Sequence, residues 1–213
     1  MLVKWSSCVT ASTSGVMIKM KFSDEDIKLA EKIAEHYRAI IELIGENPDR
    51  EGLAKTPMRA AKALIENTRG YSEDADAIVH SAIFEHEGSE IVIVKDIEFY
   101  SLCEHHILPF FGKVSIGYIP AGGIVGLSKL ARIVDTFSRR LQVQERMTHD
   151  ICELLSRVLP NRGVIVYAEA QHMCMKMRGV EKQDSTTITF EYSGEFEDIH
   201  RQNEFFTLLG VKK

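Results

Sequence analysis

The sequence has no long apolar run and no excess of positive charge. No stretch approaches the roughly 18 consecutive apolar residues of a membrane span, so we expect no membrane insertion. The formal net charge is −5, which argues against general nucleic-acid binding and requires a local basic cluster for any anionic substrate. Four cysteines in 213 residues are too few for a disulfide framework. They indicate a reducing compartment, so we expect a cytoplasmic protein with thiols free to bind metal.

The chain divides into three predicted parts. Residues 1–22 contain no acidic side chain, and we expect a disordered or variable N-terminal segment there. Ser23 and Asp26 have the spacing of a capping box and predict the start of a helix. A second helix is predicted from Thr56, so residues 23–88 form a helical region. Residues 89–213 form the third predicted part, a separate domain.

The hydrophobic period changes near residue 90 from helical to strand-like. Strands are predicted at 91–99, 113–119, 163–170 and 185–192, where β-branched and aromatic residues are frequent. Between the second and third strand, one helix is predicted to begin at Ser128 as its cap and another at Gln144. A last helix is predicted over 196–209. This order predicts an α+β domain with an antiparallel sheet and an N-terminal helical extension.

The segment SLCEHHILPF, residues 101–110, concentrates groups that bind metals or transfer protons. Cys103 and His106 can meet if the chain turns between them, in the spacing of a metal clip. His105 then points elsewhere and is free to move protons, and we expect ILPF to be strand and core. The alternative is a buried thiol beside a hydrogen-bonded histidine. Cysteine and histidine coincide a second time at His172 and Cys174. Cys103, His106 and Cys174 would give zinc three protein ligands and leave one position for water.

Two further segments carry candidate substrate contacts. In GGIVGLSKLAR, a helix N-terminus with Ser128, Lys129 and Arg132 can hold phosphates, although a capped helix with solvated charges explains the same residues. Arg178 adds a cation near the predicted metal. Arg59 and Lys62 share a helix face, as solvated basic residues often do. In QVQER, Glu145 suits a helix start, but its carboxylate can also accept two hydrogen bonds from guanine.

Several ordered blocks of the sequence together resemble the GTP cyclohydrolase I family. The resemblance covers about residues 25–209, and its blocks are REGLAKTPMRAAKAL, CEHHILPFFGK, YIP, GLSKLARIV, QVQER, HMCMKMRGV and SGEF. It implies that Cys103, His106 and Cys174 bind zinc and that His105 and His172 transfer protons. It also implies that Gln144 and Glu145 read guanine. The triphosphate site implied by the resemblance consists of Ser128, Lys129, Arg132, Arg178, Arg59 and Lys62, and we count Ser128 among the catalytic residues as well.

The resemblance also implies a fold, a reaction and an assembly. The fold, implied for a catalytic domain at residues 89–213, is a tunnelling fold, in which an antiparallel four-stranded sheet carries two long helices on one face. The reaction is the zinc-dependent opening of the guanine imidazole ring of GTP, which releases formate and gives 7,8-dihydroneopterin triphosphate for tetrahydrofolate and pterin synthesis. The assembly is a homodecamer of two pentamers with active sites between subunits.

Three alternative functions have different chemistry. A zinc-dependent purine hydrolase or deaminase uses a similar ligand set, but the H-x-E and P-C-x-x-C motifs of the deaminases are absent from the sequence. A non-catalytic pterin- or purine-binding protein of the same fold would keep only a structural zinc. A reductase of this fold would need a nucleophilic cysteine, whereas Cys103 and Cys174 are assigned to zinc.

Overall fold

The computed structural model describes residues 22–210, which form two compact units that meet in the sequence after Met58. In the first unit, α1 (Asp24–Leu43) begins after Ser23. The Ser23 hydroxyl accepts a hydrogen bond from the Asp26 N–H, and the Asp26 carboxylate accepts one from the Ser23 N–H. The predicted capping box is therefore confirmed. The predicted variable segment lies almost entirely outside the described residues.

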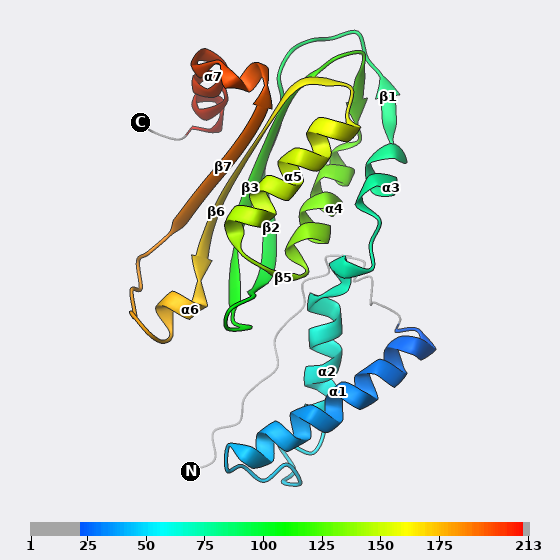
Figure 1. Ribbon diagram of the computed structural model, residues 1–213, viewed down its shortest axis with the longest axis vertical. Helices are drawn as coiled ribbons and strands as arrows, with labels where there is room; N and C mark the ends of the chain where they lie inside the picture. The colour runs from blue at the N-terminus through cyan, green and yellow to red at the C-terminus, as the bar shows by residue number, and fades with distance from the viewer. Residues whose placement is uncertain (1–21, 211–213) are drawn as a thin grey trace, which may run out of the picture. The chain divides into compact units, whose positions relative to one another are not determined.

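The second unit contains an α+β arrangement, as the alternation of periods predicts (Figure 1). The helix α2 crosses the boundary between the units. None of the helices in residues 22–210 is long and apolar enough to cross a membrane. The elements, in chain order, are α2 (Thr56–Asn67), η1 (Arg69–Tyr71), α3 (Ala75–His80), β1 (Ile83–Glu85), β2 (Val92–Cys103), β3 (Pro109–Pro120), β4 (Gly123–Val125), α4 (Leu127–Ser138), β5 (Leu141–Gln142), α5 (Gln144–Val158), β6 (Asn161–His172), α6 (Met173–Lys176), β7 (Thr187–Gly194), η2 (Glu195–Glu197) and α7 (Ile199–Leu209).

The main sheet has five strands in the order β5-β2-β3-β6-β7, not the four expected. The strands β2, β3, β6 and β7 are antiparallel neighbours, and β5 pairs with β2 in parallel. The extra strand is only Leu141–Gln142, which is too short to produce a hydrophobic period in the sequence. A separate two-stranded sheet joins β1 to β4.

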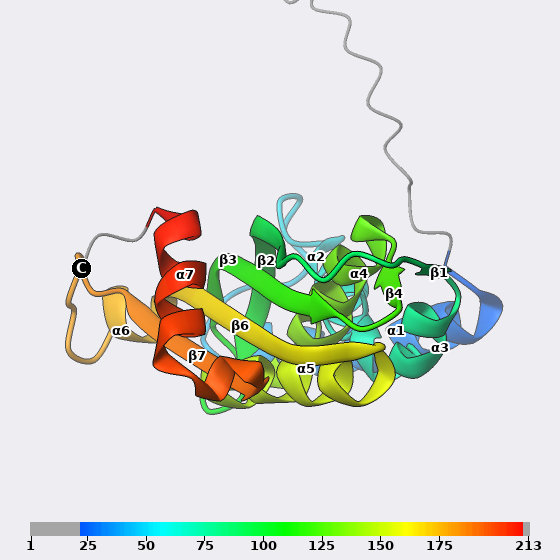
Figure 2. The ribbon, with the colours of Figure 1, turned by 90° about the horizontal axis from the view of Figure 1, so that it is seen from above.

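The two faces of the sheet bury different sets of residues. Along β6, Val164, Val166 and Ala168 belong to a core that includes the apolar faces of α4 and α5. The alternate residues Ile165 and Tyr167 belong to a second core with residues of α7. Successive strand residues point to opposite faces, so α4 and α5 cover one face and α7 lies against the other. Figure 2 shows α7 lying across β6 and β7.

Two predicted helix starts are wrong. The helix α4 begins at Leu127 after Gly126, with no side-chain cap, so Ser128 is inside the first turn and is not the cap. The last helix, α7, begins at Ile199, and residues 195–197 form a separate 3-10 turn. Asp198 sets this start because its carboxylate accepts a hydrogen bond from the His200 N–H.

Candidate metal centre and active site

The end of β2 turns sharply into β3 and places Cys103 beside His106. The carbonyl of Cys103 accepts hydrogen bonds from the N–H of His106 at 3.3 Å and of Ile107 at 2.8 Å. This is the turn that the Cys103–His106 pair requires. Ile107, which we expected in strand and core, lies in the loop with φ 54° and is exposed. A β-branched residue rarely adopts that conformation, so the turn is held by its surroundings.

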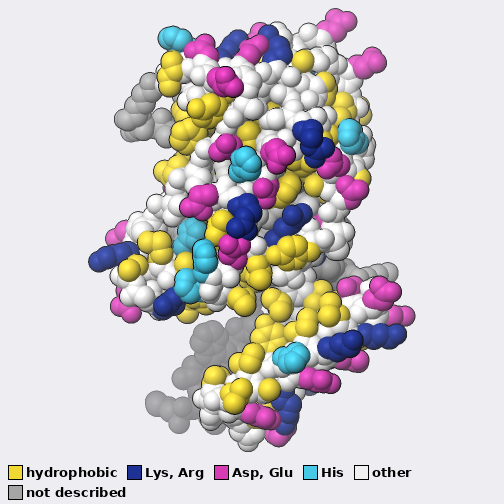
Figure 3. Space-filling model, viewed as in Figure 1, with side chains coloured by type: hydrophobic (Ala, Val, Ile, Leu, Met, Phe, Trp, Pro, Cys, Tyr) yellow, Lys and Arg dark blue, Asp and Glu magenta, His cyan; other side chains and the backbone are white. Residues whose placement is uncertain are grey.

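The third predicted ligand reaches this turn from the end of β6. The register between β3 and β6 pairs Phe110 with His172, and α6 begins directly after His172. One ligand atom from each of Cys103, His106 and Cys174 lies within 4.8 Å of the others. On the face shown in Figure 3, histidine side chains gather at the end of this unit where α6 lies.

The donor chemistry of this cluster fits a zinc ion. Two thiols and one imidazole are the ligand types that zinc takes in proteins, and three ligands leave one position open. Burial, followed by the neighbouring Cys103, raises the pKa of Cys174 above its usual range. Both causes disfavour the thiolate, and a divalent cation offsets them because it deprotonates a coordinating thiol.

Two more histidines lie at the same end of the sheet. His105 is exposed, and its Nδ1 atom is 3.9 Å from the Cys103 sulfur. The ring of His172 is half-buried and stacks on Phe110, with the centroids 4.6 Å apart and an interplanar angle of 4°. Burial lowers the pKa of His172, an effect that the charge of Glu145 opposes. At neutral pH a largely uncharged His172 can therefore accept a proton.

The two neighbouring residues of QVQER lie in different environments. Glu145 is exposed at the start of α5, where its carboxylate can reach a ligand. Gln144 is completely buried, and its side-chain amide is hydrogen-bonded to His172 and to the sheet. The family resemblance implies one role for both residues, but one side chain is buried and the other is exposed.

An ion pair that the sequence did not predict joins the Cys103–His106 turn to α5. Both carboxylate oxygens of Glu104 accept hydrogen bonds from Arg146, at 2.6 and 3.0 Å. Arg146 lowers the pKa of Glu104 below its usual range, mainly through this hydrogen bonding. The Glu104 N–H also donates to the carbonyl of Gln142. The residues were visible in CEHHILPF and QVQER, but no signal in the sequence paired them.

The predicted phosphate contacts of α4 lie apart from the cysteines and histidines. The helix ends at Ser138, shortly before Gln142, which pairs with Cys103. Ser128 and Lys129 are at its other end, about 15 Å away along a helix axis that rises about 1.5 Å per residue. Ser128 and Lys129 therefore do not lie beside Cys103, His106 and Cys174 in this chain.

The remaining predicted cations are distributed over other elements. Arg132 is exposed and lines a cavity of about 340 Å³ with Arg69, Glu73, Ile78 and Asp135. Arg178 is exposed after α6, and its charge acts on Cys174. Arg59 and Lys62 lie nearly one turn apart on α2.

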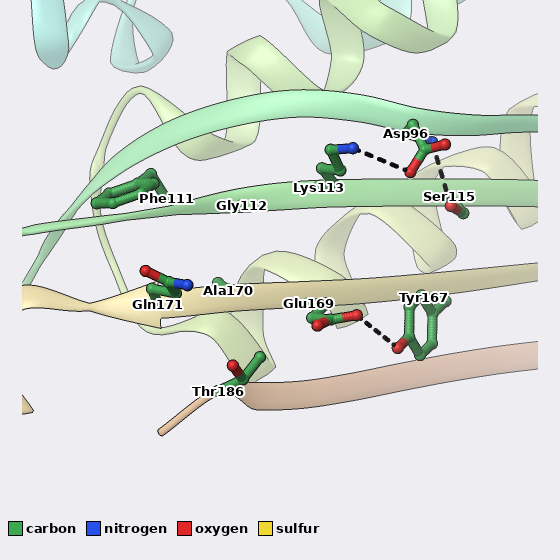
Figure 4. A pocket seen from close by; sticks show the side chains of 10 residues that line it. All are labelled: Asp96, Phe111, Gly112, Lys113, Ser115, Tyr167, Glu169, Ala170, Gln171 and Thr186. Carbon is green, nitrogen blue, oxygen red and sulfur yellow. Dashed lines mark hydrogen bonds and ion pairs between the residues drawn. The ribbon is translucent and has the colours of Figure 1, made fainter. Parts of the chain in front are cut away.

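A different cavity of about 430 Å³ lies over β3 and β6, and it contains none of the predicted site residues (Figure 4). Its charged groups contact other protein groups: Lys113 lies 3.5 Å from Asp96, and Glu169 accepts a hydrogen bond from Tyr167. Alternation along β3 places Lys113 on the face opposite α4 and α5, since Val114 belongs to their core. This cavity is therefore separate from the group formed by Cys103, His106 and Cys174.

An α+β domain that holds two cysteines and a histidine together, with two further histidines beside them, defines a candidate metal-dependent enzyme. Residues 33–210 match the family model of GTP cyclohydrolase I, so the chain belongs to that family.

Named relatives agree with this membership along most of the chain. It is 54% identical over 182 residues to GTP cyclohydrolase 1 of Porphyromonas gingivalis, with 85% of this chain and 94% of the relative covered. It is 55% identical to the Bacteroides fragilis protein of that name, with coverages of 84% and 92%. The relative from Chromohalobacter salexigens is 51% identical, with coverages of 85% and 99%. A crystal structure of archaeosine synthase QueF-Like in the apo form aligns with 51% of this chain and 97% of its own at a TM-score of 0.43 and 18% identity, too distant a likeness to bear on function.

Proposed function

We propose that this protein catalyses the hydrolytic opening of the guanine imidazole ring of GTP. One water is consumed, C8 leaves as formate, and the product is 7,8-dihydroneopterin triphosphate. The observation that carries the proposal is the convergence of Cys103, His106 and Cys174 with His105 and His172 in a member of the GTP cyclohydrolase I family. The proposal includes the tunnelling fold and the catalytic role of residues 89–213.

Cys103, His106 and Cys174 would hold the zinc ion. When bound, zinc supplies Lewis acidity and lowers the pKa of a water ligand towards about 7. His172 would exchange a proton with the substrate, and its pKa, lowered by burial, supports that role. His105 is exposed beside the same cluster. The carboxylate of Glu145 would accept hydrogen bonds from the N–H edge of guanine, and its exposure at the start of α5 supports that role.

The triphosphate would be bound by cations that a second subunit contributes. Lys129 and Arg132 make no ion pair within residues 22–210, although Arg69, in the same cavity as Arg132, pairs with Asp135. Their separation from the cysteines along α4 is explained if the α4 of one subunit faces the metal cluster of another.

The main sheet offers an edge for such an assembly. Within the described chain, β7 has a paired neighbour on one side only. It exposes Ile188, Phe190 and Tyr192. An unpaired edge with apolar side chains favours pairing with another chain. In a closed ring, the β7 strand of every subunit could pair with a neighbouring subunit, which supports the proposed decamer of two pentamers.

The direct test is incubation of the zinc-replete protein with GTP. We expect formate and a product that becomes fluorescent neopterin after oxidation, with about one zinc per subunit. Ammonia in place of formate would identify a deaminase, and no pterin from zinc-replete protein would refute the proposal. His105→Ala separates catalysis from mere binding, because we expect turnover to fall by about 100-fold or more while zinc is retained. Unchanged turnover would remove His105 from the catalytic residues.

A further inference from the structure

The side-chain amide of Gln144 can be oriented from its surroundings alone. Its Nε2 atom lies 3.1 Å from the carbonyl oxygens of Ala168 and Thr187, and 3.2 Å from the hydroxyl oxygen of Thr189. Carbonyl oxygens only accept hydrogen bonds, so the atom that faces them must be the NH₂ group. The opposite orientation would place the amide oxygen against two carbonyl oxygens with no hydrogen between them.

The same reasoning applies to the hydroxyl groups behind the amide. Thr148 donates its hydrogen to the main-chain carbonyl of Gln144 at 2.8 Å, so it must accept from Thr189, whose Oγ1 lies 2.7 Å away. Thr189 then uses its own hydrogen toward Thr148 and accepts from Gln144. The two hydrogens of the NH₂ group are shared among three acceptors, and the donor and acceptor roles of this network are consistent only with this orientation of the amide.

This orientation decides which nitrogen of His172 carries a hydrogen. The Oε1 atom of Gln144 lies 2.9 Å from Nε2 of His172. An amide oxygen only accepts, so Nε2 must be protonated, and in neutral His172 the lone pair is on Nδ1. Among the described residues, Nδ1 has no hydrogen-bond partner. The ring of Phe110 stacks on the face of the imidazole and so restricts rotation of the imidazole plane.

We propose that Gln144 is a positioning residue that holds His172 as its Nε2–H tautomer, and that it does not itself read guanine. The proton that His172 gives or takes during ring opening then moves between the substrate and Nδ1. Selection of guanine is left to Glu145, whose side chain is exposed where that of Gln144 is buried. This inference rests on the proposed function for its catalytic consequence, but the tautomer itself follows from the hydrogen bonds.

Kinetics of Gln144→Met distinguish positioning from substrate reading, because methionine has a similar length and no hydrogen-bonding amide. A positioning role predicts that kcat falls by about 100-fold, since a poorly oriented proton-transfer group forfeits much of its usual contribution. The KM for GTP and the preference for GTP over inosine triphosphate stay close to the wild-type values. A raised KM with a lost preference for GTP would overturn the proposal, since those are the effects expected of a guanine contact.

A matched control comes from the same helix and strand. Ser156 on α5 and Ser193 on β7 form a hydrogen bond of 2.6 Å between their hydroxyl groups. Ser156→Ala removes this polar contact between α5 and β7 without touching Gln144 or His172, so we expect an unchanged kcat. A comparable loss of kcat in Ser156→Ala would show that loosening of α5 explains the Gln144 variant and would overturn the proposal.

A spectroscopic measurement tests the tautomer without any turnover. Solid-state NMR of the wild-type, zinc-loaded protein with ¹⁵N-labelled histidine rings should give the Nε2–H pattern for His172. Its signals are identified as those lost in His172→Asn. In folded Gln144→Met we expect a mixture of tautomers. An Nδ1–H pattern in the wild type would overturn the proposal even if Gln144→Met does not fold. The Nε2–H pattern in a protein without activity on GTP would refute the proposed function only.

Discussion

The two ends of the second unit position their functional groups in contrasting ways. At the end near α6, strand pairing and a tight turn hold Cys103, His106 and Cys174 within a few ångströms, with His172 stacked and hydrogen-bonded beside them. At the start of α4, Ser128 and Lys129 lie on the surface of a helix and are not close to any of those groups.

The difference follows from the chemistry of each task. A metal ligand or a proton-transfer group must have a set direction and distance, and buried contacts with a sheet provide that precision. A phosphate is attracted by charge over a longer range and can be met by flexible side chains from another subunit. We therefore expect the proposed metal and proton-transfer groups to be assembled within one chain and the proposed phosphate contacts to be shared between chains.

Removal of a proposed metal ligand should have the largest effect on activity. We expect Cys174→Ser to lower kcat/KM by about 1,000-fold or more, because a metal ion contributes several kcal/mol and each 1.4 kcal/mol is a factor of ten. Zinc analysis should show a loss of bound metal. Cys152→Ser is the control: Cys152 is a buried thiol in α5 that does not belong to the group formed by Cys103, His106 and Cys174. Full activity with no zinc in Cys174→Ser would contradict the metal assignment.

Loss of a cation at the start of α4 should have a smaller effect of a different kind. In Lys129→Ala we expect the KM for GTP to rise by about 10- to 100-fold, as for the loss of a hydrogen bond to a charged group, with zinc content unchanged. Lys28→Ala, an exposed lysine on α1, provides the control for a general change in charge. An unchanged KM in Lys129→Ala would remove this residue from the triphosphate site.

Mixing two defective variants tests whether the ends of different subunits meet. Cys174→Ser supplies an intact α4, and Lys129→Ala supplies an intact metal cluster. If each active site takes one part from each of two subunits, reassembly of an equal mixture should restore about a quarter of the wild-type activity. No recovery after verified subunit exchange would place both parts of a site in a single subunit.

The smallest effect on activity is expected from the ion pair that joins the Cys103–His106 turn to α5. Glu104→Gln weakens the bidentate contact with Arg146, and we expect activity or zinc affinity to fall by about tenfold, the low end for a partner of a metal site. Arg157→Gln, which weakens a similar contact with Asp76, should leave both unchanged. Equal effects of the two variants would show that Glu104 contributes only general stability.

Local features of this protein follow from the sequence because they depend on residues that are close along the chain. Ser23 and Asp26 specify the start of α1 through hydrogen bonds three residues apart, and the short spacing of Cys103 and His106 is closed by a single turn. The repeat of Met147, Ile151 and Leu155 predicts the buried face of α5. Even the second coincidence of cysteine and histidine, at His172 and Cys174, is visible in the sequence.

Other features were decided only by the tertiary structure. The strand β5 exists because Leu141 and Gln142 lie beside β2, and a two-residue strand carries no pattern of its own. Gln144 and Glu145 are adjacent in the sequence, but one side chain points into the helix–sheet interface and the other into solvent. Sequence alone established which chemical groups this protein has. The packing of β6 and β7 against α5 decided which of them are buried and hydrogen-bonded, because burial depends on neighbours that are distant along the chain.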